Sequence, residues 1–530
     1  MVNNKLCYMK KLLLLFFFGS TINYLQAQEP EDALRLAWNV QGGTARVQAI
    51  GGAMGSLGGD ITATFVNPAG LGFYRTGDFV FTPTYTFGKT GATYLGRKEN
   101  TNTQKFAIGT TGVVWGSNDI KKTRSSAISF AINQVADFKS NIVYRGLNNS
   151  SSYSQKFLEE ITSNGDKDGN IVSGNDIEDP RFRYNYAFGT SLAFRTYWID
   201  TVGGYTNGNL RFQSRAPIAS GLLQQNTINT TGGITEFALG FGANLNDKLL
   251  VGGSIGVPVM RLQKDAEFVE ADATENSNNK FNYASYKQGL RTTGVGFNIK
   301  AGLIYKPQEY WRLGFAVHSP TVYSFTDKNT AEITTDTENY AGNLYSNLED
   351  VIGANAEFKY MHITPLRLIG SASYVLREIQ DVTKQRGFLT ADVEYVAYPM
   401  SSYFTTDENG YNDPATKEYL QSLNGAISKA YKGAFNFRAG GELKFTTIMV
   451  RAGVAYYGNP YKDIHDETGS RLNLSGGLGY RNKGFFIDAT YVHAMTKDVN
   501  VAYRLQNSPY YNADIRNTAG KVLLTVGFKI

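Results

Sequence analysis

The chain has 530 residues, with 56 glycines, 34 tyrosines and 32 phenylalanines against 13 prolines and one cysteine, and its formal net charge is +6. This charge is small for the length and no basic cluster accompanies it, so the sequence gives no indication of a nucleic-acid partner. The many aromatic residues and a mean hydropathy of −0.29 favour a membrane β-barrel over two or three soluble domains, because half of each barrel strand faces a polar lumen.

The first segment, residues 1–27, is typical of a secretory signal peptide. Two lysines precede the apolar run 12–18, and small and polar residues follow up to Ala27, where we expect cleavage. Cys7 would be removed with this leader, which excludes disulfides and thiolate metal sites from the mature chain. No later apolar run approaches the roughly 20 residues that a membrane helix needs.

A glycine-rich stretch at 42–75 follows a short segment, 31–38, that we expect to be an amphipathic helix. The stretch contains Asn67-Pro68-Ala69-Gly70, where proline fixes its own φ and biases Asn67 toward an extended conformation. Glycines permit the close backbone approach that a compact plug without a large core requires. We therefore predict an N-terminal hatch over 28–78, with an ordinary glycine-rich linker as the alternative.

From residue 79 onward, apolar and polar residues alternate with a period of two, which is the signal of a half-buried strand. In 434–445, for example, Phe435 and Phe437 oppose Arg438, and a slip of one residue would move such charges into lipid at ~2–4 kcal/mol each. About fourteen strands are expected. After the first, they lie near 104–116, 124–145, 232–246, 248–270, 285–306, 311–326, 366–378, 386–398, 434–445, 447–458, 471–481, 484–494 and 520–530.

Short turns alternate with long loops along this region. This alternation is the pattern of an up-and-down barrel. A strand-like segment at 354–362 is taken as an extension of the strand at 366. The predicted fold is all-β: a 14-stranded antiparallel transmembrane β-barrel over 79–530 with an N-terminal hatch. The long extracellular loops are expected at about 146–231, 271–284, 327–353, 399–433 and 495–519. Residues 416–431 read as an amphipathic helix within one of these loops.

Several stretches, in this order and before a barrel, resemble the hatch of the FadL/TodX family, which comprises outer-membrane transporters of long-chain fatty acids and other hydrophobic compounds. They are Gly43-Thr44-Ala45-Arg46, Gly51-Gly52-Ala53, Gly58-Gly59-Asp60 and Asn67-Pro68-Ala69-Gly70-Leu71. Asp32-Ala33-Leu34-Arg35 upstream is similar to the Bacteroidetes branch, and the stretch 312–320 resembles the family strand that ends in Ser-Pro.

The resemblance implies that the hatch plugs the lumen and that Asn67, Pro68 and Ala69 form its corner. It also implies that a kink in the third strand opens a hole in the wall close to this corner, through which ligand leaves sideways. We expect the kink at 134–138, where alternation falters, with Gln134, Asp137 and Phe138 as its residues. A simple strand irregularity is the alternative.

The sequence offers two further candidate sites. Arg438 and Arg481 could pair with a fatty carboxylate in the lumen, although a purely structural charged network is the alternative. Asn164, Asp166 and Asp168 resemble the start of a calcium loop, with a solvated acidic turn as the alternative. The four histidines have no metal-ligand spacing to one another, so neither an enzyme nor a cofactor is expected.

The predicted function is passive uptake of small hydrophobic compounds, long-chain fatty acids or aromatic hydrocarbons, across the outer membrane of a Gram-negative bacterium. The expected partners are membrane lipid and the hydrophobic ligand. Three alternatives remain open: a haem receptor, a barrel of type IX secretion whose loop at 146–231 holds a secretion or surface protein, and a structural or adhesive barrel.

Overall fold

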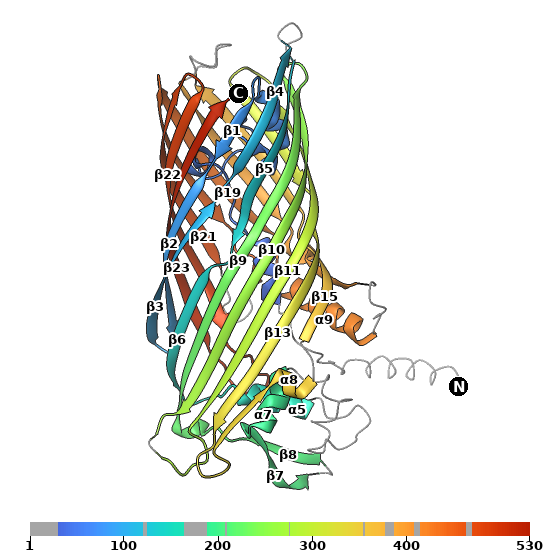
Figure 1. Ribbon diagram of the computed structural model, residues 1–530, viewed down its shortest axis with the longest axis vertical. Coiled ribbons are helices and arrows are strands. Elements are labelled where there is room, and N and C mark those ends of the chain that lie inside the picture. Colours follow the sequence, from blue (N-terminus) through green and yellow to red (C-terminus); the bar gives the residue numbers. More distant parts are fainter. Residues whose placement is uncertain are drawn as a thin grey trace, which may run out of the picture.

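The computed structural model describes residues 30–119, 124–163, 188–206, 209–274, 276–352, 356–376, 386–406, 414–462 and 469–530. Its strands form an elongated, closed, antiparallel barrel, and in the described part of the chain they make fourteen passes along the wall (Figure 1). The predicted fold class is confirmed. Among the described helices, none is both long and apolar enough to cross a membrane.

The wall closes between its first and last strands. β1 (Asp78–Phe81) and β2 (Pro83–Tyr94) both pair with β23 (Asn512–Lys529). Between them run, in chain order, β3 (Arg97–Ile108), β4 (Thr111–Asp119), β5 (Arg124–Asp137), β6 (Ser140–Asn148), β9 (Leu222–Asn244), β10 (Leu249–Asp272), β11 (Tyr283–Tyr305), β12 (Trp311–His318), β13 (Val322–Asp336), β15 (Ala356–Ile363), β16 (Arg367–Leu376), β17 (Gly387–Val396), β18 (Ser402–Thr405), β19 (Ala434–Phe445), β20 (Ile448–Tyr457), β21 (Ser470–Asn482) and β22 (Phe485–Val501).

Each crossing of the barrel wall is called a pass. Some passes consist of two consecutive strands that follow one another along the wall and pair with the same neighbouring pass. β15 continues into β16 in this way, because β15 pairs with β13 while β16 pairs with β12, the preceding part of the same neighbour. The interpretation of 354–362 as an extension of the next strand is therefore confirmed.

The remaining elements lie inside the barrel or at its loop end. The N-terminal segment 30–77, which we call the hatch segment, contains α2 (Pro30–Ala37), α3 (Ala45–Ala49), α4 (Ala63–Val66) and η1 (Pro68–Phe73), and most of its side chains are buried within the wall. At the loop end, opposite the C-terminus, a cap gathers (Figure 1). The loop elements are α5 (Ser154–Ser163), α7 (Phe188–Arg195), β7 (Ile199–Thr206), β8 (Asn209–Ser214), η4 (Ile218–Ser220), β14 (Asn343–Asn347), α8 (Leu348–Ile352), η6 (Tyr398–Met400) and α9 (Pro414–Ala430).

An apolar band surrounds the outer face of the half of the barrel near the short turns. The alternation seen in the sequence produces it, because every second side chain of each strand faces outward and is large and apolar there. Examples are Phe237, Leu239 and Phe241 on β9, Ile255 and Val257 on β10, Val295, Phe297 and Ile299 on β11, Phe435 and Phe437 on β19, and Val522 and Leu524 on β23.

The strands continue well beyond this band, so the loops are shorter than expected. β9 begins at Leu222, where it pairs with Asn148 of β6, although 146–231 was expected to be one loop. β13, β22 and β23 are extended in the same way, whereas β10 and β11 end within two residues of the prediction. Outside the band both faces of a strand are polar, and polarity alternation, the signal used for strands, is then absent. The helix predicted at 416–431 is confirmed as α9.

Candidate functional site

The corner at Asn67 is fixed by hydrogen bonds to the wall and to its own segment. Its side chain is fully buried, and Nδ2 donates to the carbonyl oxygens of Gly55 at 2.6 Å and of Leu303 at 3.2 Å. Oδ1 accepts from the amide of Ala69 at 3.1 Å, which places Asn67 as the N-cap of η1. One amide side chain thus connects two parts of the hatch segment to β11.

Glycines in the wall allow the backbone of the hatch segment to lie directly against the strands. A Cβ on Gly252 would come within 2.4 Å of the Pro68 backbone, and one on Gly302 within 2.0 Å of Asn67. We call these inward-facing positions glycine seats. Further seats include Gly242, Gly314, Gly440 and Gly453, each of which faces hatch atoms at 2.2–2.8 Å. Any larger residue at a seat would displace the plug.

Two arginines of the wall hold the C-terminal end of α2. Arg367 of β16 donates to the carbonyl of Ala37 at 2.5 Å, and Arg471 of β21 donates to that of Trp38 at 2.7 Å. The Arg471 guanidinium also lies 3.9 Å from the centre of the Trp38 ring. Cations at a helix C-terminus satisfy carbonyls that lack an intrahelical partner.

The third pass is irregular at the predicted place. Gln134 of β5 pairs with Thr235 of β9, whereas Ala136 pairs with Ile234, so one extra residue is present between them. Asn133 faces inward before this bulge and Ala136 faces inward after it, so the alternation of the strand shifts by one residue. The ladder between β4 and β5 ends just before the bulge, at the pair of Thr111 with Ile132.

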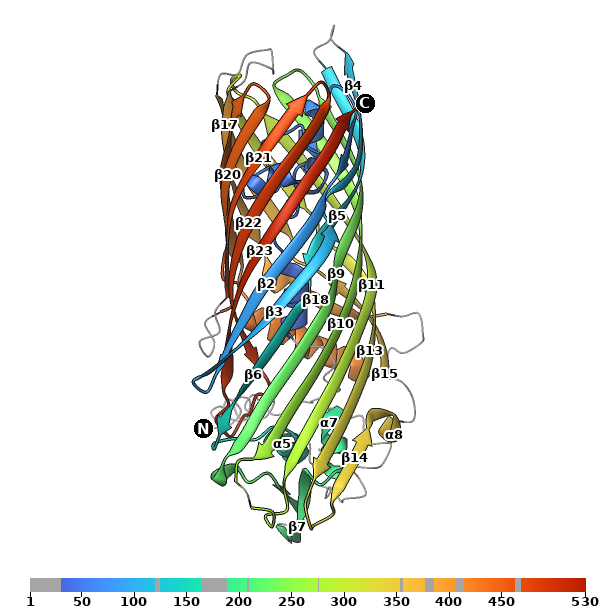
Figure 2. The same cartoon turned by 60° about the vertical axis from the view of Figure 1, so that its left-hand side comes forward.

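Beyond the bulge, β3 and β6 lie side by side without the backbone ladder that joins other neighbours (Figure 2). Both strands are fully described, and side chains alone connect them. We call this junction the seam. Its contacts are Lys105 Nζ to Asp137 Oδ1 at 2.5 Å, Lys139 Nζ to the Gln104 carbonyl at 2.6 Å, Arg145 Nε to Glu99 Oε1 at 2.6 Å, and Thr101 Oγ1 to the Asn141 carbonyl. At the seam, side-chain contacts in place of a backbone ladder therefore close the described wall.

A cavity of ≈ 90 Å³ lies in the lumen directly behind the bulge. Its lining combines the bulge, the linker after α2 and polar side chains of the wall: Leu36, Asn39, Val40, Gln41, Gly42, Phe65, Asn133, Val135, Glu236, Pro258, Asn298, Lys300, His318, Ser319, Thr321, Tyr323, Thr364, Pro365 and Arg367. Lys300 and Glu236 form a buried ion pair at 2.5 Å. An apolar cluster joins Phe138 to α2 and α9 beside it. Leu36 of α2 and Val135 of the bulge thus line the same cavity.

The structure separates the hatch corner from the bulge. Pro68 lies against Gly242 of β9, whereas the bulge faces Gly233 and its neighbours on the same strand. The bulge lies opposite Ile234 and Thr235, seven to eight residues from Gly242, so at about 3.4 Å per residue the two points are about 25 Å apart along β9. The expectation that the corner lies close to the kink is therefore wrong here. Gly42 is the nearer part of the hatch segment, because a Cβ there would lie 2.8 Å from Asn133.

Arg438 and Arg481 do not line this cavity. Arg438 is fully buried and paired with Glu394, and the Arg481 guanidinium lies 5.3 Å from the centre of the Phe486 ring. Their role as ligand contacts stays a prediction without geometric support. Asn164, Asp166 and Asp168 lie outside the described residues, as does the segment 1–29.

Comparisons with known proteins identify the fold. No protein-family model matches the sequence, and no curated protein matches it. A solved FadL homologue from Pseudomonas aeruginosa is similar in structure, with a TM-score of 0.52 and 14% identity over 93% of this chain and 99% of that chain. The chain has the FadL fold. The P. putida toluene transporter TodX is also similar, with a TM-score of 0.50 and 11% identity over 93% of this chain and 99% of that one.

Proposed function

We propose that the protein is an outer-membrane transporter of the FadL/TodX type that takes up small hydrophobic compounds passively. The observation that carries this proposal is the seam, a side-chain-closed break in the wall with a cavity and an apolar cluster behind it. Its place beside the bulge of the third pass supports lateral passage between lumen and membrane, since a hydrophobic molecule then avoids the polar headgroup layer. The similar fold of a toluene transporter supports aromatic hydrocarbons as one substrate class, with long-chain fatty acids as the other.

Uptake would proceed in two steps. The seam opens when its four side-chain contacts break, and α2 then shifts from the lumen side of the bulge. The hatch corner stays in place, because its glycine seats and the Asn67 hydrogen bonds lie far from the bulge. In this proposal the plug has a fixed part near the turn end and a part near the bulge that moves.

The test is uptake of labelled oleate and labelled toluene by cells that lack their own transporters and express the full chain. Uptake above that of empty cells is the expected result, and it should fall when Lys105 and Asp137 are replaced by cysteines and joined by a short bis-maleimide. The mature chain then contains only these two thiols, because the single cysteine lies at position 7. Equal uptake with and without the cross-link would refute passage through the seam. Enrichment of haem, or retention of a secreted protein with no uptake, would favour the alternative functions.

A further inference from the structure

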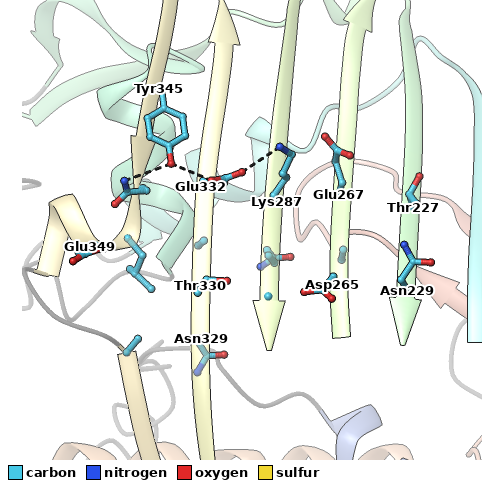
Figure 3. Close-up of a pocket in the computed structure, with 17 residues that line it drawn as sticks. Thr227, Asn229, Asp265, Glu267, Lys287, Asn329, Thr330, Glu332, Tyr345 and Glu349 are labelled. Carbon is cyan, nitrogen blue, oxygen red and sulfur yellow. Dashed lines mark hydrogen bonds and ion pairs between the residues drawn. The ribbon is translucent and has the colours of Figure 1, made fainter. Parts of the chain in front are cut away.

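A hollow of ≈ 520 Å³ lies on the outer face of the wall near the loop end, away from the lumen (Figure 3). We call it the outer pocket. Two rows of side chains cross β9, β10, β11 and β13 to form it. The first row is Asn229, Asp265, Gly289 and Thr330, and the second is Thr227, Glu267, Lys287 and Glu332. Strand pairing is regular from here down to the apolar band, so both rows are on the same outward face as Val257 and Phe297.

The hollow exists because one position in the first row has no side chain. A Cβ on Gly289 would lie 2.4 Å from Thr330 Oγ1 and 3.5 Å from Asp265 Oδ1. The rim above it is held in place by two contacts of Glu332, which pairs with Lys287 Nζ at 3.2 Å and accepts from the Tyr345 hydroxyl at 3.0 Å (Figure 3). These partly exposed contacts shape the rim, and the missing side chain at Gly289 leaves the hollow open.

On the outward face, the type of side chain changes from row to row between the apolar band and the outer pocket. Phe237, Val257, Phe297 and Val322 form one row at the edge of the apolar band. Exposed cations follow on the next rows: Arg261, Arg291 and Lys328. In the described part of the chain neither Arg261 nor Arg291 has an ion-pair partner. The outer pocket comes next, eight residues beyond Phe237 at Asn229, which is about 20 Å above the band at about 3.4 Å per residue and a strand tilt of about 40°.

This order matches the parts of one kind of lipid. Acyl chains suit the apolar band, headgroup phosphates suit the arginines, and the pocket above them suits sugars. Four carboxylates line it, those of Asp265, Glu267, Glu332 and Glu349, against the single cation of Lys287. Such a lining repels anionic groups but accepts hydrogen bonds from hydroxyls. We infer that the outer pocket binds the neutral saccharide of a phosphorylated glycolipid in the outer leaflet.

The inference rests on the proposed outer-membrane location and not on the transported compound. Its test is binding of two lipopolysaccharides to the detergent-purified mature protein, one with a neutral hexose core and one truncated to the phosphorylated headgroup. We expect about tenfold tighter binding of the first, because this factor corresponds to about 1.4 kcal/mol, close to the net value of one hydrogen bond to a charged group. Equal affinities would overturn the inference. Uptake assays are separate, so the two proposals fail independently.

Variants locate the effect. Gly289→Phe fills the hollow and should abolish the preference for the hexose core. Gly253→Phe is the matched control, since Gly253 also faces outward on the wall and a Cβ there meets only one atom, at 3.6 Å. Replacement of Arg261 and Arg291 by alanine should weaken both glycolipids alike. A preference that survives Gly289→Phe, or free core oligosaccharide binding as tightly as the intact glycolipid, would refute the assignment.

Discussion

Deletion of Val135 is the sharpest test of how the wall opens. The bulge exists because one extra residue separates Gln134 from Ala136 opposite consecutive residues of β9. Without Val135, inward and outward positions would alternate from β5 into β6 without interruption. The ladder between the second and third passes could then continue past Thr111 into the seam.

The size of the effect follows from the added hydrogen bonds. Two further backbone hydrogen bonds, each worth about 1 kcal/mol, would stabilise the closed seam by about 2 kcal/mol. This reduces the fraction of molecules with an open seam about 30-fold. Uptake of labelled oleate should fall by a similar factor if opening limits the rate. Val135→Ala keeps the extra residue and is the control, with uptake near that of the unchanged protein.

The assay needs proof that the barrel still forms, which heat-dependent migration on a gel provides. A deletion variant that is folded by this criterion and takes up oleate at the normal rate would refute passage through the seam. Lys105→Ala gives a second and opposite measurement. It removes one of the four side-chain contacts, and uptake should rise severalfold, since one partly exposed ion pair is worth about 0.5–1 kcal/mol.

Three further variants probe the plug. Asn67→Ala removes the side-chain donor to the carbonyls of Gly55 and Leu303. We expect a loss of about 2–4 kcal/mol in the free energy of unfolding and faster proteolysis of the hatch segment. Proteolysis at the normal rate would count against the role of the corner. Gly252→Val should displace the hatch segment and raise single-channel conductance in planar bilayers, whereas the outward-facing Gly253→Val should not; equal conductance would contradict the glycine-seat geometry. Arg471→Ala removes the hydrogen bond to the Trp38 carbonyl and the contact with the Trp38 ring. The fluorescence emission of Trp38 should therefore shift to the red, and it is obtained as the difference from the Trp38→Phe variant. An unchanged spectrum would show that other contacts hold α2.

The sequence predicts those parts of the fold in which one face of a strand meets lipid and the other meets the polar lumen, since the two faces then need apolar and polar side chains. Phe435 and Phe437 face outward while Arg438 faces inward, and this contrast reveals both the strand and its register. The irregularity near Asp137 is visible for the same reason, because it interrupts that contrast. Where a strand leaves the membrane, as at 222–231, both faces meet water and the contrast disappears.

Contacts that depend on three-dimensional register cannot be read from the sequence. Gly252 and Gly253 are neighbours in the chain, yet one faces the Pro68 backbone and the other faces outward. Lys105 and Asp137 are 32 positions apart, and nothing in the composition around them indicates a pair. The outer pocket likewise arises from Gly289 only because β11 places it between Asp265 and Thr330.

The glycine seats have a consequence for how such a sequence can change over time. At most seats the plug meets the wall through main-chain atoms, which are the same for nearly every residue type, whereas Gly302 meets the Asn67 side chain. At a hatch position whose main chain faces a seat, a substitution would therefore leave that contact intact, provided that the wall keeps its glycine. Only a small number of positions then carry the shape of the interior.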